Sequence, residues 1–323
     1  MERMPRFGLM ASGQMPDETP DPGVFRTIAE TAEGLGYDSL WVGDHLSFGN
    51  PILEGTVAAA AFAGYTRGIT LGTGVLLIPL RNAGLVAKQM ASLDYLTGGR
   101  LICGIGVGGD SPKDFELVGI DPRQRGARAD EGIEVMKGLW SAPTASFHGR
   151  FHDFEDVGIS PLPTQPGGPP VWVGGKAEGA LRRAGVLADG WIAYMVSPER
   201  YATNLQIIRD HASGADREPS AITPAMMIPT RIGATTPQAE EELRIHLTNR
   251  YHREFTTELI RKVCLAGTPE HIAARVGEYV EAGVEHLVFL SGGAPSDSIS
   301  QFEMLYKEVV VSFGANQSSR SPA

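Results

Sequence analysis

Residues 100–110 read RLICGIGVGGD, an apolar run that ends in glycines and an aspartate. Two earlier stretches have the same form: residues 38–45 are DSLWVGDH and residues 69–80 are ITLGTGVLLIPL. Each is typical of a short buried strand that stops at glycine or at charged residues. The three begin at residues 38, 69 and 100, and a segment with helical periodicity lies between each pair. This repeat predicts a parallel (β/α) barrel whose polar strand ends gather at one rim.

The rest of the chain supplies the strands that complete a (β/α)8 TIM barrel. Two segments interrupt the repeat and are expected as insertions. Residues 142–170 hold six prolines and an expected hairpin at HGRFHDFED, and residues 235–265 are charged and helical. The other strands are expected near residues 7–11, 171–175, 190–193, 222–232 and 286–290.

Length and composition favour one α/β domain over residues 1–313, followed by a disordered tail at 314–323 (GANQSSRSPA). The chain has 323 residues, with 28 basic and 38 acidic side chains and a net charge of −10. This balance argues against nucleic acid or an anionic membrane as a partner. No apolar run reaches the roughly 18 residues of a membrane helix. Cys103 and Cys264 lack metal or CxxC spacing, so a cytoplasmic protein is expected.

The glycines at 104, 106 and 109 spell GxGxxG after a predicted strand, as in a dinucleotide-binding turn. That interpretation requires a helix that opens on the third glycine and an acid at the end of the next strand. Here Ser111 and Pro112 interrupt the pattern, and Asp130 lies within a predicted helix. The motif is therefore interpreted as a glycine-lined loop.

Such a loop lets backbone N–H groups approach an anion. The segment 171–176 (VWVGGK) repeats the arrangement one strand later and adds the charge of Lys176. The alternative is that these glycines only turn the chain tightly. Two such loops on adjacent strands favour a shared phosphate site formed by Gly108, Gly109, Gly174 and Gly175.

Asp44 and His45 follow the strand that contains WVGDH. A histidine at the rim titrates near neutral pH, and a neighbouring acid can select its tautomer, which suits a general acid or base. The alternative is a solvated or structural histidine.

Seven segments carry a family resemblance, and together they cover most of the chain: WVGDH at 41–45, LGTGVLLIPLRN at 71–82, AKQMASLDYLTGGR at 87–100, GIGVGG at 104–109, PPVWVGG at 169–175, ALRRAGVLADGW at 180–191 and GTPEHIAARVGEYVEAGVEHLV at 267–288. With these segments the chain resembles the bacterial luciferase-like monooxygenase superfamily, and within it the branch that uses the deazaflavin coenzyme F-420.

The resemblance implies that the cofactor lies at the C-terminal rim with its ring system in the barrel mouth. It further implies that Asp44 contacts the deazaflavin, that His45 lies near the reacting carbon, and that the peptide between Gly74 and Val75 is cis. The candidate catalytic residues are His45 and Asp44. The candidate cofactor-contacting residues are Asp44, Gly74, Val75, Gly106, Gly108, Gly109, Asp110, Gly174, Gly175 and Lys176.

The resemblance favours F-420 over FMN, because FMN-using monooxygenases of this superfamily often carry a glutamate with two histidines at the end of strand two. The implied activity is hydride transfer between F-420 and a small organic substrate, with His45 handling the matching proton. The alternatives are an FMN-dependent two-component monooxygenase and a non-catalytic cofactor-binding barrel. A glucose-6-phosphate dehydrogenase is not expected, because such relatives have a carboxylate at the position of Gly109, and Asp110 comes one residue late.

Other chemistries have weaker support. Of six lysines only Lys176 lies at a predicted strand end, which disfavours an aldolase-type Schiff base. His148 and His152 flank a loop glycine without a matching carboxylate cluster, so no metal site is expected. The expected partners are the small-molecule substrate, a second copy of the chain in a homodimer, and a separate reductase that recycles the cofactor.

Overall fold

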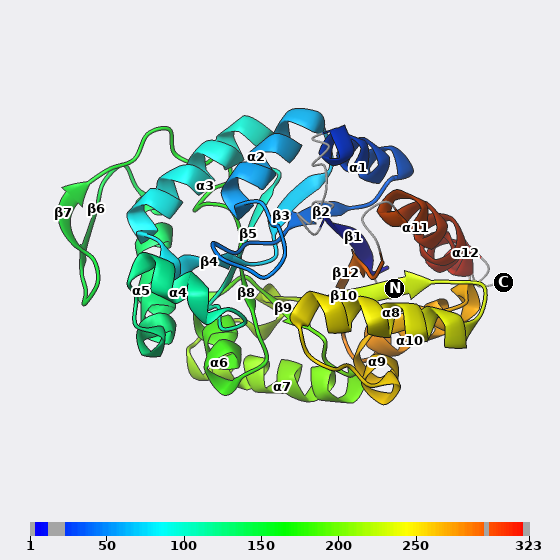
Figure 1. Ribbon diagram of the computed structural model, residues 1–323. Helices are drawn as coiled ribbons and strands as arrows, with labels where there is room; N and C mark the ends of the chain where they lie inside the picture. Colours follow the sequence, from blue (N-terminus) through cyan, green and yellow to red (C-terminus); the bar gives the residue numbers. More distant parts are fainter. Residues whose placement is uncertain (1–3, 12–22, 294–296, 319–323) are drawn as a thin grey trace.

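The computed structural model describes residues 4–11, 23–293 and 297–318. Eight parallel strands close into a barrel with helices around it (Figure 1), because β12 pairs with β1 and β9 pairs with β10. The predicted (β/α)8 barrel is therefore confirmed. In barrel order the strands are β1 (Arg6–Ala11), β2 (Ser39–Val42), β3 (Thr70–Thr73), β5 (Leu101–Gly106), β8 (Val171–Gly174), β9 (Gly190–Tyr194), β10 (Thr223–Ile232) and β12 (His286–Ser291).

Helices connect each strand to the next and cover the outside of the barrel (Figure 1). Several begin at side-chain caps; for example, Ser197 caps the helix that starts at Pro198, as its sequence predicts. The helices are α1 (Gly23–Leu35), α2 (Gly55–Tyr65), α3 (Ala83–Thr97), α4 (Pro112–Val118), α5 (Arg125–Ser141), α6 (Glu178–Leu187), α7 (Pro198–Gly214), α8 (Thr236–Tyr251), α9 (Thr257–Val263), α10 (Pro269–Glu281), α11 (Ser298–Met304) and α12 (Val311–Ser318).

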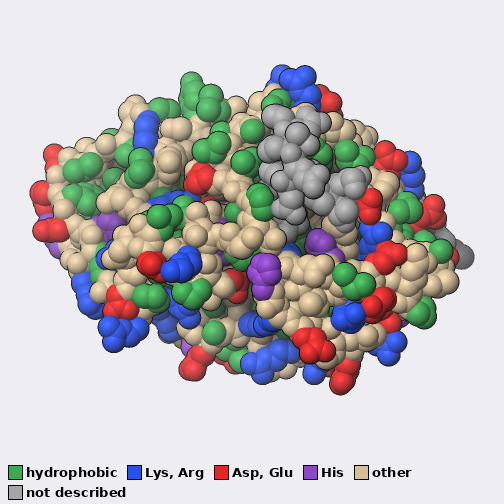
Figure 2. Space-filling model, in the orientation of Figure 1, with side chains coloured by type: hydrophobic (Ala, Val, Ile, Leu, Met, Phe, Trp, Pro, Cys, Tyr) green, Lys and Arg blue, Asp and Glu red, His purple; other side chains and the backbone are tan. Residues whose placement is uncertain are grey.

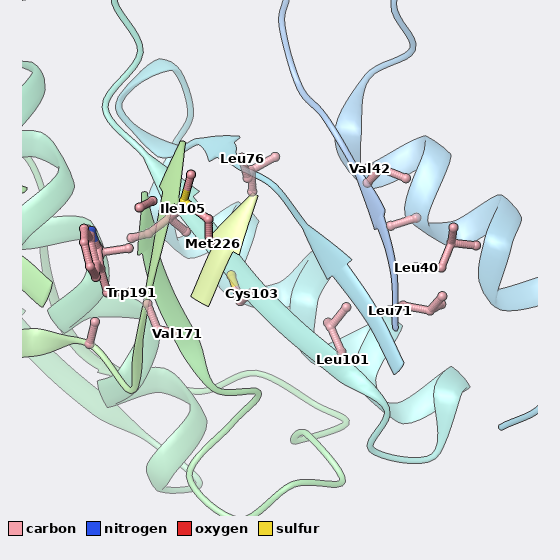
Figure 3. Close-up of a cluster of buried hydrophobic side chains, with 14 of the residues drawn as sticks. Leu40, Val42, Leu71, Leu76, Leu101, Cys103, Ile105, Val171, Trp191 and Met226 are labelled. Atoms are coloured by element: carbon pink, nitrogen blue, oxygen red, sulfur yellow. The ribbon is translucent and has the colours of Figure 1, made fainter. Parts of the chain in front are cut away.

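Alternate residues of the barrel strands face the helices and form the main core (Figure 3). On β2 these are Leu40 and Val42, and on β5 they are Leu101, Cys103 and Ile105. Their side chains are nearly or completely buried. Because strand and helix contribute apolar faces to the same layer, the outer core holds each connection against the barrel.

The interior of the barrel is filled by large side chains rather than left as a channel. Trp41 and Trp172 lie with ring centroids 5.3 Å apart, and His286 meets both rings edge-on. Gly72 makes room for this packing, since a Cβ there would lie 2.3 Å from the Trp41 ring. The Trp41–Trp172–His286 cluster fills the barrel below the rim. The space for a ligand is therefore at the carboxyl ends of the strands.

Both expected insertions have defined structure. The first contains the expected hairpin, β6 (Ala145–His148) and β7 (Asp153–Val157), which projects beside α5 (Figure 1). The second forms α8, α9 and the short strand β11 (Leu265–Gly267), which extends the sheet from β10. A two-residue strand, β4 (Leu76–Leu77), pairs with the end of β5 and was not expected.

The C-terminal segment is more regular than the sequence predicts. A π-helical stretch, Leu305–Val310, joins α11 to α12, and α12 continues to Ser318. The helix therefore extends past Gly314, where the disordered tail was expected to begin. The last residues of that expected tail, 319–323, lie outside the described part of the chain.

The face of the molecule in Figure 2 carries interspersed basic and acidic side chains. Among the described residues, none of the helices combines the length and apolarity needed to cross a membrane. Both cysteines are buried free thiols.

Candidate active site at the barrel rim

A pocket of about 680 Å³ opens at the carboxyl ends of the barrel strands. This volume lies within the range of small-molecule and cofactor sites. The lining includes all ten candidate cofactor-contacting residues, which lie at or just after the ends of β2, β3, β5 and β8, together with His45. The structure therefore brings every candidate site residue from the sequence into one cavity.

Asp44 lines the pocket and forms an ion pair with Arg81. Its two carboxylate oxygens accept hydrogen bonds from the guanidinium of Arg81, each at 2.8 Å. They also accept the backbone amides of Gly55 at 3.0 Å and Leu77 at 2.9 Å. Burial opposes the charge on Arg81, but Asp44 and Glu54 raise its pKa above the ordinary value.

These contacts join the end of β2 to β4 and to the first turn of α2. The Arg81 guanidinium and the two backbone amides together supply four hydrogen-bond donors to this buried carboxylate. Asp44 lines the pocket with its carboxylate oxygens held by these donors, and its expected catalytic role stays a prediction.

His45 is oriented by a second buried acid. Its Nδ1 lies 2.8 Å from Oδ2 of Asp114, and its ring stacks on Phe48 at 4.3 Å between centroids. The other oxygen of Asp114 accepts the amides of Leu46 and Ser47 at 2.8 and 2.7 Å. An ionised carboxylate can only accept, so Nδ1 carries the proton and Nε2 is the basic nitrogen. Nε2 has no partner among the described residues, which leaves it free to exchange a proton in the pocket.

Asp114 was missed by the sequence analysis. Ser111 and Pro112 were interpreted as an interruption, whereas they are the N-cap and first residue of α4. Because α4 begins at Pro112 and not at Gly109, the dinucleotide-binding pattern stays interrupted, but a serine followed by proline is itself a helix start, and an acid in the next positions completes the signal. Asp114 lies in the first turn of α4, with its side chain fully buried against the loop after β2.

The peptide between Gly74 and Val75 is cis, as the family resemblance implies. It lies at the end of β3 and places Val75 on the floor of the pocket. Gly106 and Gly174 flank this side chain closely, since a Cβ on either would lie 2.4 or 2.9 Å from a Val75 methyl. Glycine at both positions is therefore required for the floor to keep its shape.

The two glycine loops both approach Val75 and line the same pocket. Gly109 and Gly175 have φ values of +137° and +122°, a region that favours glycine. In the described structure the backbone amides of Gly108, Gly109 and Gly175 donate no hydrogen bond. Free amides on glycine residues suit a phosphate, so these residues fit the phosphate of a flavin or deazaflavin.

The second insertion forms part of the pocket wall, through Arg250, Tyr251 and Arg253. Arg261 of the same insertion lies outside the lining and pairs with Glu240, whereas Arg250 lines the pocket. Tyr251 shares a hydrogen bond of 2.8 Å with Tyr194 at the end of β9. Burial, and then the charge of Arg253, lower the pKa of Lys176.

The two histidines considered as metal ligands have other partners. His148 lies on the hairpin beside Asp153 and Glu155, and His152 is held by Glu131. Within residues 4–11, 23–293 and 297–318, no group of three or more histidine, cysteine or acidic side chains is placed to bind a metal ion.

A closed barrel with a plugged interior, a rim pocket and an oriented histidine belongs to the class of (β/α)8 barrels that act on small molecules. More specifically, the chain is a member of the luciferase-like monooxygenase family, whose sequence model matches residues 5–286.

Two relatives illustrate the range of similarity. An uncharacterized protein of Mycobacterium tuberculosis (strain ATCC 25618 / H37Rv) is 38% identical over 186 residues, covering 51% of this chain and 63% of that protein. The match thus spans less than two thirds of that relative's length. An F-420-dependent glucose-6-phosphate dehydrogenase of Kineococcus radiotolerans is 29% identical over 318 residues, covering 90% of this chain and 92% of the relative.

Among solved structures, an F-420-dependent secondary alcohol dehydrogenase, in complex with an F-420–acetone adduct, superposes with a TM-score of 0.83. It covers 95% of this chain and 98% of its own, at 19% identity. At that identity the similarity establishes the shared fold.

Proposed function

We propose that this protein is an oxidoreductase that uses coenzyme F-420 to transfer a hydride to or from a small organic substrate. The observation that carries the proposal is the His45–Asp114 pair, whose free Nε2 lies on the same pocket as the two glycine loops. The F-420-dependent relatives of similar length support the choice of coenzyme.

When bound, the deazaflavin supplies a ring carbon that can give or accept a hydride. The residues of this chain hold and orient the reactants. The amides of Gly108, Gly109 and Gly175 would bind the phosphate, and Val75 would support the ring system from below. Asp44 and Arg81 keep the ends of β2 and β4 in register beneath it.

His45 would move the proton that accompanies the hydride. Asp114 fixes its tautomer, so that Nε2 accepts a proton from an alcohol or returns one to a carbonyl oxygen. Phe48 stacks on the His45 ring, and Tyr251 meets Phe48 edge-on with the ring centroids 6.5 Å apart. A separate reductase would restore the coenzyme between turnovers.

The choice of coenzyme is tested by titrating the purified protein with F-420 and with FMN, read by fluorescence quenching. We expect saturable binding of F-420 and at least about tenfold weaker binding of FMN. Tighter binding of FMN would favour the monooxygenase alternative. Binding of F-420 without turnover on a panel of alcohols and ketones would favour the non-catalytic barrel.

The role of His45 is tested by His45→Ala. We expect turnover to fall by about a hundredfold or more, with F-420 affinity kept, because the variant loses only proton transfer. Asp114→Asn should reduce turnover by about tenfold or more and shift its pH profile, because an amide does not enforce the tautomer. His148→Ala, on the exposed hairpin, is the control and should leave turnover unchanged. Normal turnover of His45→Ala would remove this residue from the mechanism.

A further inference from the structure

The pocket wall above His45 and the glycine loops carries a surplus of positive charge. Lys176, Arg250 and Arg253 all line the cavity. The acidic side chains of the lining are Asp44, which Arg81 already neutralises, and Asp110. The pocket therefore presents more cations than its own carboxylates can pair.

Arg250 shows this surplus most clearly. Its Nε and Nη1 are buried, and neither has a hydrogen-bond partner in the described structure. Two other arginines with little exposed side chain have acidic partners, since Arg81 pairs with Asp44 and Arg183 pairs with Asp130. Buried guanidinium nitrogens without a hydrogen-bond partner are costly, so an anion that reached them would bind strongly.

The position of Arg250 is fixed from two sides. Its carbonyl oxygen accepts a hydrogen bond of 2.9 Å from the side chain of Asn50, which lies in the loop after β2. Its guanidinium lies 5.7 Å from the ring centroid of Tyr251. An anion-binding group that is held in place before the ligand arrives loses little entropy on binding.

Two further cations, Arg253 and Lys176, add to the positive electrostatic potential near Arg250. Arg253 lies against the rings of Tyr251 and Phe255 and has no ion-pair partner in the described part of the chain. Lys176 donates only to the carbonyl oxygen of Met195, at 3.2 Å. The lowered pKa of Lys176, due to burial and to Arg253, agrees with cations that crowd one cavity.

We propose that Arg250, with Arg253 and Lys176, forms a subsite for an anionic group, a carboxylate or a phosphate, of the small molecule that occupies this pocket. Its two arginines lie on the second insertion, and Lys176 joins them from the end of the glycine loop after β8. Two molecules can supply the anion under the proposed function, on which this step rests: the substrate or the acidic side chain of the coenzyme. The stack from His45 through Phe48 to Tyr251 places the subsite on the histidine side, which favours the substrate.

The first test uses inorganic phosphate and malonate as probes, titrated by calorimetry into the protein without coenzyme. We expect wild type to bind at least one probe and Arg250→Gln to bind it at least about tenfold more weakly. Arg244→Gln is the matched control, because Arg244 lies on the same helix, pairs with Glu241 at 2.7 Å and is not part of the lining. Arg250→Lys should recover part of the affinity, which separates loss of charge from misfolding.

The proposal is overturned if wild type binds neither probe, or if Arg250→Gln binds as wild type does. The source of the anion is decided by titrating F-420 and its ribityl chromophore, which lacks the phosphate and the glutamates. If Arg250→Gln weakens F-420 binding but not chromophore binding, the coenzyme side chain occupies the subsite. If neither changes while probe binding falls, the substrate occupies it. Probe binding by a protein that binds no F-420 would support the subsite while refuting the proposed coenzyme.

Discussion

At the scale of single residues, His286 is a buried base with no role at the rim. It lies at the start of β12, inside the barrel, with Nε2 2.7 Å from the hydroxyl oxygen of Ser39. That hydroxyl also accepts the indole N–H of Trp41 at 2.7 Å. Nδ1 is buried and has no partner in the described structure. Burial, and then the charge of Arg6, lower the pKa of His286 to about 3.

This lowered pKa predicts a loss of stability in mild acid. In the unfolded chain a histidine binds a proton below about pH 6.5, whereas folded His286 stays neutral down to about pH 3. The contribution of neutral His286 to the free energy of unfolding is therefore complete above pH 6.5. It is lost as the pH falls from 6.5 towards 3. The free energy of unfolding is expected to fall by up to about 1.4 kcal/mol for each pH unit in this range.

Denaturant unfolding at several pH values between 6.5 and 5 measures this slope. His246 adds a similar dependence, because burial and the charges of Arg250 and Arg231 lower its pKa to about 4. His286→Gln should thus reduce the slope by about half, whatever it does to stability at pH 7. An unchanged slope would mean that His286 is not the group that titrates.

At the scale of elements, the loops after β5 and β8 were predicted correctly as neighbours, because parallel strands place their carboxyl ends on one rim. Helix α4 was not predicted, since its seven residues give too little periodicity to detect. Because α4 was not predicted, Asp114 was not recognised as the partner of His45.

The close packing around Val75 predicts the effect of Gly106→Ala. The new Cβ would lie 2.4 Å from a Val75 methyl, so the Val75 side chain must shift into the pocket. We expect the affinity for F-420 to fall by about tenfold or more, with a loss of about 1–3 kcal/mol in stability from overpacking.

Gly179→Ala is the control for this substitution. Gly179 lies within α6, and a Cβ there meets no atom within 4 Å. Alanine should leave coenzyme affinity unchanged and add about 0.5–1 kcal/mol of stability. Equal coenzyme affinity in Gly106→Ala and wild type would show that the floor at Val75 does not support the ligand.

At the scale of the whole molecule, the expected homodimer stays a prediction. Helices α2 and α3 lie side by side on the outside of the barrel (Figure 1) and expose large apolar side chains. Val57, Leu85, Tyr95 and Leu96 are between 57% and 75% exposed. Such side chains on neighbouring helices are typical of a surface that is covered by a partner.

Sedimentation at micromolar concentration tests this expectation. We expect a dimer for wild type and for Val311→Glu, which changes an exposed apolar residue on α12, and a dimer weakened at least about tenfold for Leu96→Glu. The burial of a carboxylate without a partner is the physical reason for the loss. A wild-type monomer would contradict the homodimer, and a stable Leu96→Glu dimer would place its interface elsewhere.

The sequence by itself determined the barrel and the location of the pocket. Both depend on local signals: the apolar runs, the helical segments between them, and the glycines and the Asp44–His45 pair where strands end. The resemblance to the luciferase-like family, carried by the same segments, is confirmed.

Only the tertiary structure decided what each polar residue does. Asp44 meets Arg81 across 37 positions of sequence, His45 meets Asp114 across 69, and Asn50 meets Arg250 across 200. Pairings at such separations produce no periodic pattern in the amino-acid sequence. They form only when the barrel closes and brings its loops to one rim.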